Sequence, residues 1–87
     1  GFAGSSVMSR VAGAFEPLTD VGQTIRTGEV VGRIHSLDAL DQPAVTVCAD
    51  SAGIVVGQRA QAHVLRGDFL LHLGEEVEES ALLKSRN

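Results

Sequence analysis

The feature that most constrains the fold is an internal repeat at a spacing of 39 residues. Residues 25–34, Ile-Arg-Thr-Gly-Glu-Val-Val-Gly-Arg-Ile, align with residues 64–73, Val-Leu-Arg-Gly-Asp-Phe-Leu-Leu-His-Leu. Gly28 meets Gly67, an acid follows each glycine, and apolar residues meet at the first, sixth, seventh and tenth positions. Upstream, residues 13–15 align with 53–55 at a spacing of 40, a one-residue slip that a turn can absorb. Two such units pair by burying an apolar face against each other, which predicts one domain with a pseudo-twofold axis.

The distribution of glycines along the chain indicates that this domain is all-β. Ten glycines separate short segments rich in valine, isoleucine and leucine, a pattern typical of strands joined by turns. We expect Gly28 and Gly67 to occupy equivalent turns with positive φ, because glycine adopts that backbone conformation without strain. The clearest predicted strands cover 29–36, 44–49, 53–58 and 68–73, and weaker ones cover 7–12 and 14–18.

The predicted domain covers residues 7–74. Residues 1–6 lack the basic and apolar pattern of a signal peptide and are interpreted as a tag remnant or a disordered start. Residues 75–87 contain four glutamates followed by one lysine and one arginine. This composition predicts either a short acidic helix or a tail, because acids near the beginning and bases near the end suit the helix dipole.

Composition excludes several classes of partner. The net charge is −4, and the only aromatic residues are three phenylalanines, so neither phosphate binding nor base stacking is expected and nucleic acid is not a predicted partner. No apolar run approaches the ~18 residues of a membrane span. The single cysteine, Cys48, cannot form an internal disulfide, which fits a reducing compartment and predicts a cytoplasmic protein.

The two repeats, each with a glycine–acid turn, resemble the barrel-sandwich hybrid fold of biotinyl and lipoyl carrier domains. In those carriers, a lysine at the hairpin between the halves receives the cofactor. The corresponding segment here, His35–Pro43, contains no lysine, and the only lysine in the chain is Lys84. The resemblance therefore implies the fold, but the carrier function is excluded and no cofactor is expected in this chain.

A closer resemblance covers roughly residues 11–74. Residues 13–25 and 28–35, with their Gly-Ala-Phe-Glu-Pro and Gly-Arg-Ile-His segments, are similar to the C-terminal part of the succinylglutamate desuccinylase/aspartoacylase family. So are residues 49–57 and 64–70. The match is best to bacterial members that deacylate N-acyl amino acids. The resemblance implies a parent enzyme with a zinc-binding catalytic domain ahead of this segment, carrying a His-x-x-Glu motif, a second histidine and a glutamate that activates water.

No catalytic or metal site is predicted within these 87 residues. His35 and Asp38 have the spacing of the His-x-x-Glu motif, with aspartate in place of glutamate. A zinc site needs a third protein ligand, and neither His63 nor His72 has a ligand-like spacing to His35. Cys48 has no flanking base and is expected to fill a buried position on its strand. We therefore expect neither zinc binding nor hydrolase activity from this chain alone.

Two function classes remain. In the first, the chain is a non-catalytic accessory domain that packs on the catalytic domain of the same polypeptide and shapes substrate access or oligomerisation. In the second, it is an independent binding or assembly module on the same scaffold. In the first class, the projecting segment joining the halves is the expected interface, and weak self-association of this chain through the exposed face is expected. The interface candidates are Glu16, His35, Leu37, Asp38 and Leu40.

Overall fold

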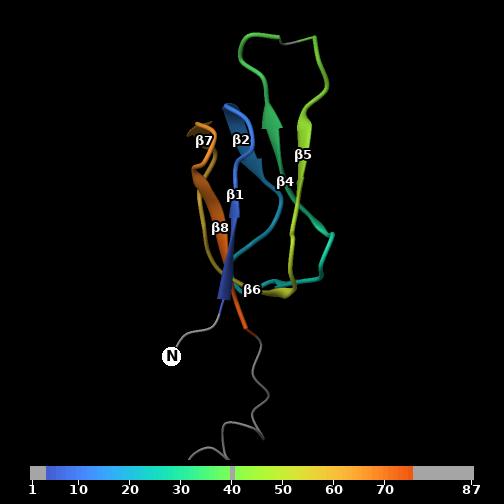
Figure 1. The fold of residues 1–87 in the computed structure, drawn as a ribbon, viewed down its shortest axis with the longest axis vertical. Coiled ribbons are helices and arrows are strands. Elements are labelled where there is room, and N and C mark those ends of the chain that lie inside the picture. The colour runs from blue at the N-terminus through green and yellow to red at the C-terminus, as the bar shows by residue number, and fades with distance from the viewer. Residues whose placement is uncertain (1–3, 40, 76–87) are drawn as a thin grey trace, which may run out of the picture.

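The computed structural model describes residues 4–39 and 41–75, which form eight strands and, within these ranges, no helix (Figure 1). The strands make two four-stranded antiparallel sheets, so the all-β prediction is confirmed. No helix of the described residues is long and apolar enough to cross a membrane. The strands are β1 (Gly4–Met8), β2 (Gly13–Pro17), β3 (Thr24–Ile25), β4 (Val30–His35), β5 (Val45–Cys48), β6 (Gly53–Gln58), β7 (Ala62–Val64) and β8 (Phe69–Gly74).

The strand order of the two sheets follows the repeat. We call β1-β8-β6-β3 sheet A and β5-β4-β2-β7 sheet B. In the repeat, β4, β2 and β7 of sheet B correspond to β8, β6 and β3 of sheet A, and these strands have the same order in both sheets. The edge strands β5 and β1, which lie outside the aligned residues, hold equivalent places beside β4 and β8. The short strands are exchanged, since β3 pairs with β6 and β7 pairs with β2. Each repeat therefore completes the sheet of the other.

The two glycine turns are equivalent in their backbone contacts. Gly28 has φ 86° and Gly67 has φ 93°, so the predicted positive φ is confirmed at both. In one turn Glu29 accepts a hydrogen bond from the backbone N–H of Arg26 at 3.1 Å, and in the other Asp68 accepts one from Leu65 at 2.8 Å. The acid after each glycine thus closes its own turn, which explains why both repeats carry one.

The one-residue slip between the repeats arises in the connection after the first strand of each. Ala14 pairs with His35, and the equivalent Ile54 pairs with Gly74. The register of β6 against β8 then shifts between Val55 and Gly57, and the extra residue of this bulge is exposed, so it does not disturb the core. The connection from β6 to β7, residues 59–61, is shorter than that from β2 to β3, residues 18–23, so the spacing has fallen to 39 at the second glycine turn.

The core lies between the inward faces of the two sheets. Phe15, Ile34, Val64 and Leu70 form one buried cluster. The other contains Val7, Ile25, Val31, Ala49, Val55, Leu71 and Leu73. The half-buried Val47 of β5 packs against both clusters. Phe15 and Ile34 alternate with outward-facing residues on β2 and β4, which fixes the outer face described below.

Some boundaries differ from the sequence expectations. The first strand begins at Gly4 and ends at Met8, so it starts before the expected beginning of the domain at residue 7. The two shortest strands, β3 and β7, were not among the predicted strands. Beyond Glu75, the predicted acidic helix or tail lies outside the described residues.

Candidate functional site

A charged cluster lies on the outer face of sheet B, on β2 and β4. The buried neighbours Phe15 and Ile34 point into the core, so Glu16 and His35 point away from it. Glu16 pairs directly with Arg33 across the two strands, and His35 lies two pairs further along, opposite Ala14. The antiparallel register therefore brings one acid and two basic side chains together.

The distances identify Glu16 as the centre of this cluster. His35 Nε2 lies 3.0 Å from Glu16 Oε1, within hydrogen-bond distance, and a carboxylate oxygen accepts, so the imidazole N–H donates. Arg33 Nη1 lies 3.9 Å from the same oxygen, an ion pair beyond hydrogen-bond distance. The three side chains remain between 39% and 52% exposed. They hold one another in place while their outer surfaces stay accessible to a partner.

The loop between β4 and β5 begins at this cluster and extends past the neighbouring strands, at the end opposite to the start of β1 (Figure 1). Ser36 Oγ accepts hydrogen bonds from the backbone N–H groups of Asp38 at 3.3 Å and Ala39 at 3.1 Å, which orders the base of the loop. Leu37 is 54% exposed and Asp38 is exposed. Leu40 lies outside the described residues.

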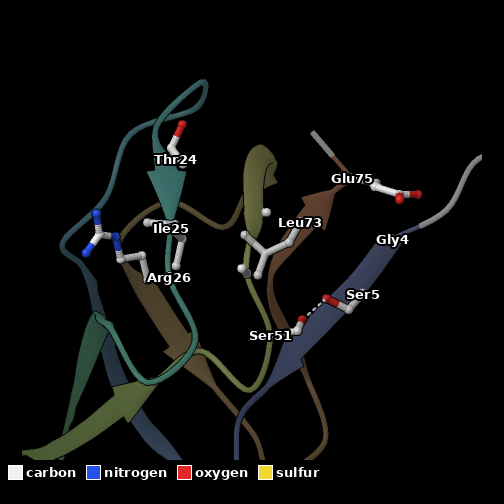
Figure 2. Close-up of a pocket in the computed structure, with 11 residues that line it drawn as sticks. Gly4, Ser5, Thr24, Ile25, Arg26, Ser51, Leu73 and Glu75 are labelled. Atoms are coloured by element: carbon white, nitrogen blue, oxygen red, sulfur yellow. Dashed lines mark hydrogen bonds between the residues drawn. The ribbon is translucent and has the colours of Figure 1, made fainter. Parts of the chain in front are cut away.

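A hollow of about 480 Å³ lies at the far end of sheet A, beside the start of β1 and the end of β8 (Figure 2). Its floor contains Ile25 and Leu73. At its rim Ser5 Oγ and Ser51 Oγ lie 2.6 Å apart. Arg26 and Glu75 lie on opposite sides of it and do not point toward one another (Figure 2). The polar groups do not converge on one point, so this hollow has the geometry of an open end of the sandwich rather than of a ligand site.

The expectation that Cys48 is buried is wrong. Cys48 lies on β5, an edge strand of sheet B, and is exposed. It alternates with Val47, which packs against both core clusters, so its side chain points the other way. It lines a smaller hollow of about 180 Å³ together with Val7 and Val11.

The three histidines lie at separate places. His35 belongs to the charged cluster, and His63 of β7 lies on the other side of Ala14 from it, on the same face. His72 lies on sheet A, where Nδ1 is 2.6 Å from Ser6 Oγ and the ring is 5.3 Å from that of Phe69. Within the described ranges, no group of three or more His, Cys, Asp or Glu side chains could hold a metal ion. The residues described here therefore do not fit a zinc site.

The structure brings together two of the interface candidates, Glu16 and His35, which are 19 positions apart in sequence. Leu37 and Asp38 follow on the projecting loop. Sequence reasoning missed Arg33, which shares this face of sheet B with His63. The sequence carried no direct signal for it, because Arg33 becomes a neighbour of Glu16 only through the register of β2 against β4.

Comparison with known proteins identifies similar structures. No protein-family model matches the sequence, and no curated protein matches it either. Among solved structures, a succinylglutamate desuccinylase/aspartoacylase from Rhodobacter sphaeroides is 32% identical, with a TM-score of 0.76, over 86% of this chain and 23% of its own. The product-bound ectoine utilization protein EutE (DoeB) from Ruegeria pomeroyi is 30% identical, with a TM-score of 0.75, over 82% of this chain and 22% of its own.

A third similar structure is an aspartoacylase family protein from Mesorhizobium loti, with a TM-score of 0.79 at 24% identity, over 85% of this chain and 24% of its own. At that identity the likeness is one of fold. The chain thus spans less than a quarter of the length of each of these proteins. Their structural likeness covers more than four-fifths of the chain, and most of their own length has no counterpart in it.

Proposed function

We propose that the chain is a non-catalytic accessory domain of a longer, bacterial, zinc-dependent deacylase of the succinylglutamate desuccinylase/aspartoacylase family, acting on N-acyl amino acids in the cytoplasm. The observation that carries the proposal is the combination of 30–32% identity over more than four-fifths of this chain with coverage of less than a quarter of the similar proteins. A short chain that matches one part of a longer protein is expected to act with the remainder, and zinc would be bound by that remainder.

The proposed fold is a barrel-sandwich hybrid. Its support is the interlocking of the repeats, in which each half contributes one short strand to the sheet of the other. In carrier domains of this kind the loop between the halves presents a lysine, whereas here the loop between β4 and β5 contains none. A loop that projects without a group to modify is suited to contacting a neighbouring domain.

The proposed interface with the catalytic domain contains Glu16, His35, Leu37, Asp38 and Leu40. Its support is that Glu16 and His35 are in contact, and that Leu37 is exposed on the loop that begins beside them. Docking there would shape the entrance to the substrate site of the catalytic domain. The domain itself supplies no reacting group in this proposal.

Two steps test the proposed function. The first is to determine the reading frame upstream of residue 1 and to find whether it encodes a segment of a few hundred residues with a His-x-x-Glu motif. The second is to measure hydrolysis of N-acetyl amino acids by that longer protein with and without residues 1–87. We expect the deletion to reduce turnover without removing zinc. A start codon near Met8, or unchanged turnover after the deletion, would instead favour an independent binding module.

A further inference from the structure

The four edge strands of the two sheets are not equally protected. An edge strand presents unpaired backbone N–H and C=O groups that another strand can bind, and shortness reduces this tendency. The edges β3 and β7 have only two and three residues. The loop after β5 contacts β1 and its continuation, since Ser51 Oγ lies 2.6 Å from Ser5 Oγ and Asp50 Oδ1 lies 3.9 Å from Arg10 Nη2. This leaves β5, the outermost strand of sheet B, as the open edge of the described part of the chain (Figure 1).

Hydrogen bonds at the end of β5 indicate which of its backbone groups are free. Ala49 N–H donates to the Glu29 carbonyl at 2.9 Å, and the Ala49 carbonyl accepts from Gly28 N–H at 2.7 Å. Both groups of Ala49 thus point to the side of β4. The backbone groups of successive residues in a strand point to opposite sides. Those of Thr46 and Cys48 therefore point to the open edge, where no described strand pairs with them.

The side chains of this edge offer no protection against pairing. Residues 44–49 are Ala-Val-Thr-Val-Cys-Ala, without a charged residue or a proline. Lysine and proline are the residues by which proteins prevent an edge from pairing. Thr46 and Cys48 are exposed, and Val45 is 47% exposed. An exposed, uncharged edge rich in β-branched residues is typical of a strand that accepts another strand.

The open edge is complementary to a second copy of itself. When two copies of β5 run antiparallel about a twofold axis at Val47, Thr46 of each copy lies opposite Cys48 of the other, and these are the residues with free backbone groups. Over residues 44–49 no charge meets a like charge. The hollow of about 180 Å³ that Val11, Val45 and Val47 help to line would lie beside its symmetry copy. The twofold arrangement therefore satisfies the backbone and brings two apolar surfaces together.

We propose that β5 is a dimerisation edge, at which two copies of the chain pair their β5 strands antiparallel and join their B sheets into one sheet of eight strands. The inference does not depend on the proposed function, because it uses only the edge of this domain. An edge of a few residues covers far less than the roughly 1,600 Å² of a stable complex. The dimer is therefore weak and forms as the protein concentration rises.

Sedimentation velocity of the 87-residue chain from about 10 µM to about 1 mM covers the range of weak association. A reductant is present, so that Cys48 cannot cross-link two copies. Thr46→Pro removes an N–H that faces the open edge, and we expect the dimer dissociation constant to rise at least about tenfold. Cys48→Lys places a charge on the edge and should have the same effect. Cys48→Lys also reduces the net negative charge of the chain, so weaker pairing cannot come from general repulsion between copies.

Two controls separate the edge from the rest of the surface. Thr46→Ala removes the side chain but keeps the backbone N–H, and should leave the dimer dissociation constant unchanged. Val56→Lys makes the same charge change as Cys48→Lys at an exposed residue of β6, which is not an edge strand, and should also have no effect. Circular dichroism establishes that each variant keeps its strands. If Thr46→Pro does not fold, the comparison of Cys48→Lys with Val56→Lys decides.

Each outcome decides the inference. A wild-type dimer that the edge variants weaken and the controls do not supports it. A wild type that stays monomeric throughout, edge variants that dimerise like the wild type, or controls that weaken the dimer equally overturn it. Association that Leu37→Asp abolishes and Cys48→Lys does not would assign self-association to the β4–β5 loop and overturn it. Dimerisation that appears only after removal of residues 76–87 would assign the edge to that segment of the same chain and likewise overturn it.

Discussion

The two equivalent glycine turns allow the cost of a left-handed backbone to be measured twice in one molecule. A β-carbon added at Gly28 or at Gly67 would have no heavy atom within 4 Å. Any loss of stability on substitution by alanine therefore comes from the positive φ, 86° and 93°, and not from a clash.

The expected loss follows from two opposing contributions. Placing a non-glycine residue in the left-handed region costs about 1–2 kcal/mol, while alanine restricts the unfolded chain and returns about 0.4–1 kcal/mol. The net loss should be about 1 kcal/mol at each turn, which lowers the Tm of a domain of this size by roughly 4–8 °C. Asparagine tolerates this conformation better than alanine, so Gly28→Asn should lose less than Gly28→Ala.

Urea unfolding followed by circular dichroism measures these differences. Gly57→Ala is the matched control, because its added β-carbon also has no neighbour within 4 Å but its φ is not positive. We expect this control to lie within about 0.5 kcal/mol of the wild type. Losses at Gly28 and Gly67 that are no larger than at Gly57, or that differ from each other by more than about 1 kcal/mol, would refute the reasoning from equivalent turns.

Three further predictions concern the core, the loop and the metal. Gly32→Ala should lower the free energy of unfolding in urea by about 1–3 kcal/mol, because the added β-carbon would lie 2.5 Å from Phe15 Cε1 and 2.9 Å from the Glu16 carbonyl oxygen. An unchanged urea midpoint would contradict this close approach. Leu37→Asp should keep the β signal in circular dichroism and change stability by less than about 0.5 kcal/mol, since Leu37 is exposed. Loss of that signal would mean that Leu37 caps the core. The chelator-treated chain should contain no stoichiometric zinc and show no amidase activity, and elemental analysis finding one zinc per chain would disprove this.

The repeat made much of the fold predictable from sequence. It identified the equivalent turns, and the apolar segments between glycines placed the four clearest strands close to where the structure has them. The strands β3 and β7 could not be found in this way, because segments of two and three residues are strands only through pairing with β6 and β2. Cys48 was misjudged for a related reason: whether a residue on a short edge strand is covered depends on the neighbouring sheet and not on its own segment.

The candidate site was predictable only in part. The residues Glu16 and His35 were chosen from separate motifs, and nothing in either motif indicated that they touch. Their contact depends on the register of β2 against β4, which sets His35 diagonally across from Glu16. Arg33 was overlooked because it lies between buried residues on a strand judged mainly for its apolar pattern. Charges on a sheet surface acquire neighbours through strand pairing, so they are the last features that a linear reading recovers.

The pairing of Gly4 with Gly74 places the beginning of β1 beside the end of β8, so these two points of the chain could be joined by a linker. In sheet B the equivalent strands β4 and β5 are connected by the loop after His35, whereas in sheet A the equivalent β8 and β1 lie side by side without a connection between them. A short linker from Glu75 to Gly4, with new ends opened in the β4–β5 loop, would yield a circular permutant with the same strand pairs. Because Gly4 and Gly74 lie side by side, the domain could also be inserted into a surface loop of a host protein. The two host residues that flank the insertion would then stay close together.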